Sequence, residues 1–159
     1  MDTHLIQKCR DDIIQVGRAA HQKGMIVGRG GNISVRLGPQ EFLCTAHSAA
    51  LGFLKPSDFL VMNVKGEIIE GGGKPSTESN LHGTIYLETE AGAVVHLHPP
   101  YTSLLAAKGI EINPMTFESS LFLGKSIPVL EQESPSVTRV EGVIDALKLS
   151  NIIILKEHG

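Results

Sequence analysis

Apolar residues recur every three or four positions between residues 3 and 23, and this spacing predicts an amphipathic helix. Its expected apolar face consists of Leu5, Ile6, Cys9, Ile13, Val16 and Ala20. Gly24 stands where the helix should end, because glycine readily adopts the left-handed conformation that closes a helix.

Residues 32 to 37 alternate between apolar and polar side chains, which is typical of a strand with one face in the core. The apolar face consists of Ile33, Val35 and Leu37. Residues 41 to 45 follow a Gly38-Pro39 turn and are expected to pair with this strand. The first part of the chain is therefore predicted to form a helix followed by a hairpin.

The rest of the chain mixes the same two patterns. Strands are expected over residues 59–64, 67–70, 93–97, 127–130 and 151–156, of which 93–97 and 151–156 are apolar enough to be buried. Helices are expected from Ser76 or Thr77 to about residue 89, over 101–108 and 117–123, and from Pro135 to about residue 149. Because several strands are joined by hairpins, we predict an α/β fold of the α+β type, with an antiparallel or mixed sheet.

Composition limits the classes of protein. The 159 residues are 42% hydrophobic and 19% charged, with a formal net charge of −3, which suits one domain spanning residues 1–159. No basic cluster suggests a nucleic-acid partner. No apolar stretch reaches the ~20 residues that span a bilayer, and no secretion signal is evident. We therefore predict a cytoplasmic protein without a membrane partner, with Cys9 and Cys44 as small core residues.

The sharpest chemical signal is the pair of histidines His96 and His98. In a strand, residues two apart point to the same face, so both imidazoles can reach one ion. A purely structural role is the alternative, but two neighbouring histidines would repel each other if charged and need partners if neutral. The pair therefore favours a metal site.

A third ligand is expected, because catalytic zinc usually has three protein ligands and one open position. His158 follows another apolar strand and is the first candidate, with His82 on a predicted helix as its competitor.

Glu78 is a candidate for acid–base chemistry, since it stands near a glycine run and a helix start. It is either a general base, a fourth ligand that substrate displaces, or a carboxylate that only caps the helix. Ser76 and Thr77 could cap the helix or hold an anion, and Gly31 and Asn32 lie in a glycine-rich loop with similar capacity.

Five stretches together resemble the class II aldolase/adducin family, and its L-fuculose-phosphate aldolases in particular. They are GRGGNISVR (28–36), KPSTESNLH (74–82), AVVHLHP (93–99), SIPV (126–129) and EHG (157–159). Their order and approximate separations fit that family over nearly the whole chain.

The resemblance implies a central, mainly antiparallel sheet flanked by helices, in a homotetramer with a sugar-phosphate substrate. It implies that His96, His98 and His158 bind Zn²⁺ or another divalent transition metal. It implies that Glu78 moves the proton next to the carbonyl of dihydroxyacetone phosphate, whose enediolate zinc stabilises. The phosphate-binding set would be Gly31, Asn32, Ser76 and Thr77, together with the loop that holds His47 and Ser48.

Three positions depart from the family pattern. His47 and Ser48 stand where the aldolases usually have Thr-Gly, which weakens the inference of a phosphorylated substrate. No tyrosine is present near residues 116–119, where a neighbouring subunit offers an acid; Glu118 could serve there or could be only a surface charge. The chain stops at Gly159, where relatives continue, so it is either a minimal member or truncated.

Three functions therefore remain open. The first is a zinc-dependent aldolase, a lyase that cleaves or forms a carbon–carbon bond in a small sugar phosphate. The second keeps the metal but is a dehydratase, of the methylthioribulose-phosphate kind, or a 4-epimerase. The third is a non-catalytic, adducin-like interaction module, against which the complete set of three histidines argues.

Overall fold

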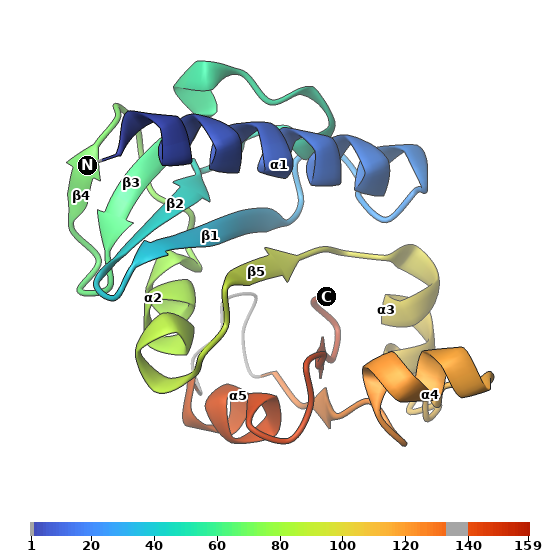
Figure 1. Ribbon diagram of the computed structural model, residues 1–159. Helices are drawn as coiled ribbons and strands as arrows, with labels where there is room; N and C mark the ends of the chain where they lie inside the picture. Colours follow the sequence, from blue (N-terminus) through green and yellow to red (C-terminus); the bar gives the residue numbers. More distant parts are fainter. Residues whose placement is uncertain (1, 133–139) are drawn as a thin grey trace. The chain divides into compact units, whose positions relative to one another are not determined.

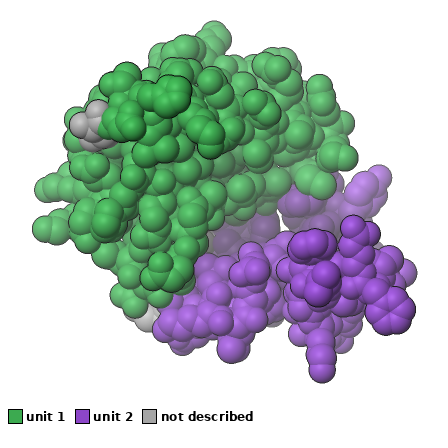
Figure 2. Space-filling view, in the orientation of Figure 1, with its two compact units in different colours: residues 1–97 green, residues 98–159 purple. Residues whose placement is uncertain are grey.

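The computed structural model describes residues 2–132 and 140–159. The chain divides into two compact units, residues 1–97 (unit 1) and residues 98–159 (unit 2), which Figure 2 shows in different colours. The prediction that residues 1–159 form a single domain stays a prediction. Within the described residues, no helix is both long and apolar enough to cross a membrane.

Unit 1 is built on a five-stranded sheet (Figure 1). Its strands are β1 (Asn32–Gly38), β2 (Glu41–Thr45), β3 (Phe59–Asn63), β4 (Ile68–Glu70) and β5 (Ala93–His96), in the order β4-β3-β2-β1-β5. Every pair of neighbours is antiparallel, which confirms the predicted kind of sheet and both predicted hairpins. Two short 3-10 helices, Leu51–Phe53 and Pro56–Asp58, connect β2 to β3.

The two faces of this sheet bury different apolar clusters, because successive strand residues point to opposite sides. Helix α1 (Thr3–Gln22) covers one face, over a cluster that includes Ile13, Ile33, Leu43 and Val61. Helix α2 (Ser79–Glu88) contributes Tyr86 to the cluster on the other face, with Phe42, Cys44, Leu60 and Met62. The predicted sheet flanked by helices is thus confirmed, and Cys9 and Cys44 are free and buried as expected.

The face of α1 that enters the core differs from the predicted one at two positions. Leu5 and Val16 are 37% and 43% exposed, so their placement in the core was wrong. The buried residues are Ile6, Cys9, Ile13, Gly17 and Ala20. A Cβ at Gly17 would collide with the carbonyl oxygen of Leu51, so glycine allows α1 to lie close to the 3-10 helix Leu51–Phe53.

Strand β5 is at the edge of the unit 1 sheet, next to β1. Its prediction as a buried strand was wrong, since Ala93 is exposed and Val95 is 48% exposed. Apolar composition alone does not distinguish an edge strand from a central one.

Unit 2 contains three helices and a short parallel ladder among its described residues. They are α3 (Pro100–Ala107), α4 (Phe117–Leu123), α5 (Val140–Leu147), β6 (Val129–Leu130) and β7 (Ile154–Leu155). Strands β6 and β7 pair in parallel, and Ile154 and Leu155 are buried. Both strands are shorter than predicted, and the predicted helix start at Pro135 lies outside the described residues.

Candidate active site

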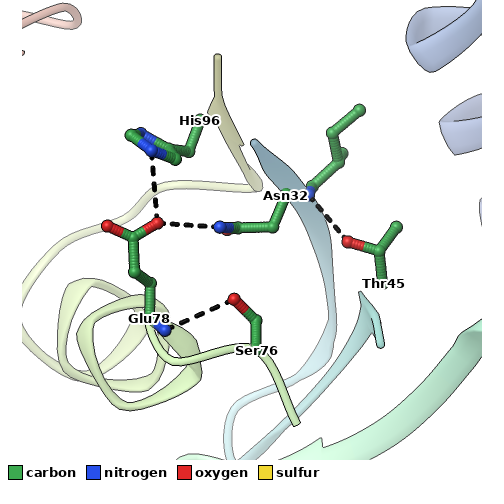
Figure 3. A network of polar contacts seen from close by, with 6 residues as sticks. Asn32, Thr45, Ser76, Glu78 and His96 are labelled. Atoms are coloured by element: carbon green, nitrogen blue, oxygen red, sulfur yellow. Dashed lines mark hydrogen bonds and ion pairs between the residues drawn. The ribbon is translucent and has the colours of Figure 1, made fainter. Parts of the chain in front are cut away.

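A buried carboxylate lies at the start of β1 in unit 1. Asn32 and His96 are paired residues on β1 and β5. The Asn32 side-chain amide donates to Glu78 Oε2 at 2.7 Å, and the same oxygen lies 3.3 Å from His96 Nε2 (Figure 3). Glu78 is only 5% exposed. These three residues, named the Asn32–Glu78–His96 cluster below, bring together one metal-ligand candidate and the candidate base.

The turn before α2 directs Glu78 toward this cluster. The Glu78 backbone N–H donates to Ser76 Oγ at 3.3 Å, and the Ser79 hydroxyl donates to the Ser76 carbonyl at 2.9 Å. Glu78 itself occupies the N-cap position of α2, and its side chain makes no capping hydrogen bond. The capping prediction for Ser76 or Thr77 was therefore wrong, and so was the capping alternative for Glu78.

The anion-binding candidates meet at one end of the unit 1 sheet. Strands β1 and β2 are antiparallel, so the start of β1 and the end of β2 lie together, where the Ile33 N–H donates to Thr45 Oγ1 at 3.1 Å (Figure 3). The His47 N–H donates to the Lys74 carbonyl at 2.8 Å, and Ala46 forms a β-bridge with Pro75. The candidates grouped at this end are Gly31, Asn32, His47, Ser48, Ser76 and Thr77.

Two backbone conformations at this end are unusual. Gly31 has a φ of 83°, and a Cβ there would lie 2.6 Å from the His96 carbonyl oxygen, so only glycine fits. Ser48 has a φ of 59°, in the left-handed region that glycine adopts without strain. Ser48 and His47 are both exposed, so their side chains are accessible to a ligand.

A second polar network joins β1 to α2, one helical turn beyond Glu78. Ser34 Oγ is 2.7 Å from both His82 Nδ1 and the Tyr86 hydroxyl, and all three residues are buried. Burial lowers the pKa of His82 to about 4, although the nearby Glu78 carboxylate acts in the opposite direction. Burial also raises the pKa of Tyr86 to about 12. His82, the predicted competitor for metal, is thus a partner of Ser34 in unit 1.

The sequence analysis did not single out Ser34, Arg36 and Tyr86 as residues of the site. The Arg36 guanidinium lies over the Tyr86 ring, 4.9 Å from its centroid, and donates to the carbonyls of Thr89 and Ala91 at 2.8 and 2.9 Å. The signal that could have found Ser34 and Arg36 is the run of polar side chains on alternate positions of the first strand, and the spacing of four residues from Glu78 to His82 and from His82 to Tyr86 is the matching signal on the helix.

In unit 2, His98 and His158 lie side by side. Their ring centroids are 5.2 Å apart, the rings are inclined at 77°, and their candidate ligand nitrogens lie within 4.8 Å of each other. His158 belongs to a tight turn after β7, in which the Leu155 carbonyl accepts from the N–H groups of His158 and Gly159 at 3.0 Å. Glu157, within this turn, has a φ of 60°. Two of the three predicted metal ligands are therefore neighbours in this unit.

The remaining candidate, Glu118, is exposed in the first turn of α4. The N-cap of that helix is Thr116, whose hydroxyl accepts from the Ser119 N–H at 3.0 Å. Its role as an acid stays a prediction. His96, the other predicted metal ligand, ends β5 in unit 1, with only Leu97 between it and His98.

Comparison with known proteins finds a matching family and named relatives of this chain. The protein-family model described as the class II aldolase and adducin N-terminal domain matches residues 11–159 of this chain. An L-fuculose phosphate aldolase from Methanocaldococcus jannaschii is 34% identical over 151 residues, which cover 94% of this chain and 81% of that protein. A 3-oxo-tetronate 4-phosphate decarboxylase from Haemophilus influenzae is 32% identical, over 99% of this chain and 76% of that protein.

A solved structure shares the fold. The L-fuculose-1-phosphate aldolase from Thermus thermophilus superposes with a TM-score of 0.81 and 32% identity, covering 92% of this chain and 74% of that one. The relatives thus carry the names of more than one reaction.

Proposed function

Because this chain belongs to the class II aldolase and adducin family, we propose that it is a metal-dependent aldolase that cleaves or forms a carbon–carbon bond in a small sugar phosphate. One observation carries this proposal: the buried Glu78 carboxylate, which hydrogen-bonds Asn32 and contacts His96. A buried carboxylate beside a metal-ligand candidate suits proton abstraction, because it is shielded from water and held in one direction.

His96, His98 and His158 are the proposed metal ligands. His98 and His158 already lie close enough to share an ion, and a single residue separates His96 from His98 along the chain. Three imidazoles suit Zn²⁺ and several other divalent transition metals, so the donor chemistry fits such an ion. When bound there, the ion supplies Lewis-acid polarisation of a substrate carbonyl.

Glu78 would take a proton from the carbon next to that carbonyl in one direction and return it in the other. Its Oε2 accepts from the Asn32 amide, which keeps the carboxylate from rotating toward solvent. The side chain is buried, so little water competes for the proton. Asn32 therefore has a positioning role and Glu78 the catalytic one.

The substrate phosphate would bind at the end of the sheet where Gly31, His47, Ser48, Ser76 and Thr77 gather. The start of α2 lies at this end, and the N-terminus of a helix attracts an anion. His47 and Ser48 are exposed, and the hydrogen bond from His47 to Lys74 fixes the loop. This arrangement supports a small phosphorylated substrate.

Decarboxylation is the second candidate reaction, because the 3-oxo-tetronate 4-phosphate decarboxylase relative covers nearly the whole chain. Loss of carbon dioxide from a 3-oxo acid and aldol cleavage both leave a carbanion next to a carbonyl. The same Glu78 could protonate that carbon. Dehydration or epimerisation would instead require a further acid, for which Glu118 is the candidate.

A substrate panel tests these reactions. Zinc-loaded protein is incubated with dihydroxyacetone phosphate and several aldehydes, with a 3-oxo-tetronate 4-phosphate, and with methylthioribulose phosphate. We expect an aldol adduct whose formation falls by about 10²–10⁴-fold in Glu78→Gln, as is typical when an acid–base group is lost. Glu88→Gln, an exposed charge removed at the end of the same helix, is the matched control.

Loss of carbon dioxide or of water, without any adduct, would replace the aldolase proposal by the corresponding alternative. Full activity in Glu78→Gln would overturn the role of Glu78 in every one of these reactions. The homotetramer and the cytoplasmic location remain proposals; the former is tested by light scattering of the purified protein.

A further inference from the structure

Strand β1 and helix α2 carry three polar contacts in the same order. Asn32 contacts Glu78, Ser34 contacts His82, and Arg36 lies over the ring of Tyr86. The strand residues are two positions apart and the helix residues four positions apart. We name these three contacts the β1–α2 ladder.

The spacing of the ladder follows from elementary geometry. Two strand residues advance about 6.7 Å, and four helix residues advance about 6.0 Å. The two repeats therefore stay nearly in step over three contacts, and every second strand residue and every fourth helix residue faces the partner element. A shift of α2 along β1 would break all three contacts together.

The middle contact has a preferred direction of hydrogen bonding. If His82 Nδ1 carried its proton, it would donate to Ser34 and Ser34 to Tyr86, and the Tyr86 proton would then need another acceptor. If Tyr86 donates to Ser34 and Ser34 donates to Nδ1, both hydroxyl protons have an acceptor. A backbone hydrogen bond from Val94 counts among the influences that lower the pKa of Tyr86, which agrees with a Tyr86 oxygen that accepts from the backbone. The second arrangement leaves the His82 proton on Nε2.

We propose that Ser34, His82 and Tyr86 are positioning residues, which hold His82 as its Nε2–H tautomer and thereby fix the start of α2 so that Glu78 faces Asn32 and His96. His82 is one helical turn beyond Glu78, and its backbone N–H donates to the Glu78 carbonyl at 3.0 Å. Anchoring the His82 side chain to β1 therefore restricts the turn from which the Glu78 side chain projects. The expected effect on proton transfer by Glu78 rests on the proposed function. The assignment of the His82 tautomer does not rest on it.

Nitrogen-15 NMR of histidine-labelled, zinc-loaded protein tests the tautomer. His82→Gln assigns the His82 signals by their disappearance. We expect a protonated Nε2 and an Nδ1 that accepts a hydrogen bond, and we expect the Nδ1 signal to shift in Ser34→Ala. A proton on Nδ1 in the wild-type protein would overturn the proposal, whatever the substrate.

Exchange of deuterium from solvent into dihydroxyacetone phosphate, without an aldehyde, tests the positioning. Misplacing a catalytic group by a fraction of an ångström is costly, so Ser34→Ala and Tyr86→Phe should each lower kcat by about ten-fold or more. Their KM should stay within about two-fold, because the phosphate contacts are elsewhere. Ile85→Val, on the same helix but outside the ladder, is the control for a general loss of packing.

The two readouts separate the possible failures. No exchange in the wild-type protein would refute the proposed function and leave the NMR result to decide the tautomer. Wild-type kcat in both variants, or a loss that Ile85→Val reproduces, would overturn the positioning role and leave the proposed function standing.

Discussion

Unit 1 and unit 2 hold their candidate site residues in different ways. In unit 1, the Asn32–Glu78–His96 cluster belongs to a five-stranded sheet and to the β1–α2 ladder, so many contacts fix each side chain. In unit 2, His158 lies in one tight turn after a two-residue parallel ladder, and His98 precedes α3 and lies against the ring of His158. The contrast predicts that substitutions in unit 1 change both folding and the position of Glu78, whereas those in unit 2 act mainly on ligand binding.

Removal of a metal ligand from unit 2 should have the largest effect. Loss of a residue that only hydrogen-bonds a metal ligand typically lowers metal affinity 10–100-fold. Loss of a ligand itself should cost more, so His98→Ala and His158→Ala should each weaken zinc binding by roughly a thousand-fold. Neither ring belongs to the apolar clusters of unit 1, so the urea midpoint of the metal-free protein should hardly change. Isothermal titration and urea unfolding measure the two quantities.

His47→Ala is the control for that experiment, since His47 is an exposed histidine of unit 1. Its zinc affinity should equal that of the wild-type protein. Unchanged affinity in both unit 2 variants would refute the proposed ligand set.

The buried His82 should make the stability of unit 1 depend on pH. Burial lowers its pKa to about 4, below the ordinary value of 6.5 that applies to the unfolded chain. The unfolded chain then binds more protons between these values, so stability is complete above pH 6.5 and is lost as the pH falls toward 4. The loss in the metal-free protein should reach roughly 3 kcal/mol.

Comparison with His82→Gln isolates this contribution from that of the carboxylates, which titrate in both proteins. Urea unfolding of both from pH 7 to pH 4 should give curves that converge at low pH. Parallel curves would show that His82 is not buried in the uncharged form.

A substitution at Gly31 should disturb the sheet of unit 1 directly. Gly31→Ala places a Cβ in a left-handed backbone and 2.6 Å from the His96 carbonyl oxygen. The left-handed conformation alone costs roughly 1–2 kcal/mol, so a total loss of about 2 kcal/mol or more in the free energy of unfolding is expected. In Gly38→Ala, no atom lies within 4 Å of the added Cβ, and the change should be slight or stabilising.

The smallest expected effect concerns the turn that carries His158. Glu157 has a φ of 60°, so Glu157→Gly should relieve strain and stabilise the chain by about 0.5–1 kcal/mol. Glu157→Ala keeps a Cβ and should leave the free energy of unfolding unchanged. A loss of stability in the glycine variant would indicate that unit 2 is not strained at this turn.

Local patterns predicted much of unit 1. The periodicity of residues 3 to 23 predicted α1, and alternation together with the Gly38-Pro39 turn predicted β1 and β2. These elements follow from neighbours in the sequence, as do the hairpin pairings. The kind of sheet and the family were predicted for the same reason, since their motifs are short and contiguous.

The errors arose where distant segments decide the outcome. The contact of His82 with Ser34 was not predicted, because it depends on how α2 aligns with β1. The edge position of β5, and with it the exposure of Val95, depends on strand order. Helix α2 begins at Ser79, with Glu78 rather than Ser76 at its N-cap, and the Glu78 side chain instead bonds Asn32, which is far along the chain.

The matched repeats of β1 and α2 also bear on attempts to graft this chemistry onto another scaffold. Transplanting Glu78 on a helix alone would leave behind the strand whose side chains orient it. A one-residue deletion between Asn32 and Arg36 would turn the polar side chains on one side of the deletion toward the face that α1 covers. The smallest transferable module is therefore the strand and the helix together, joined in their original alignment.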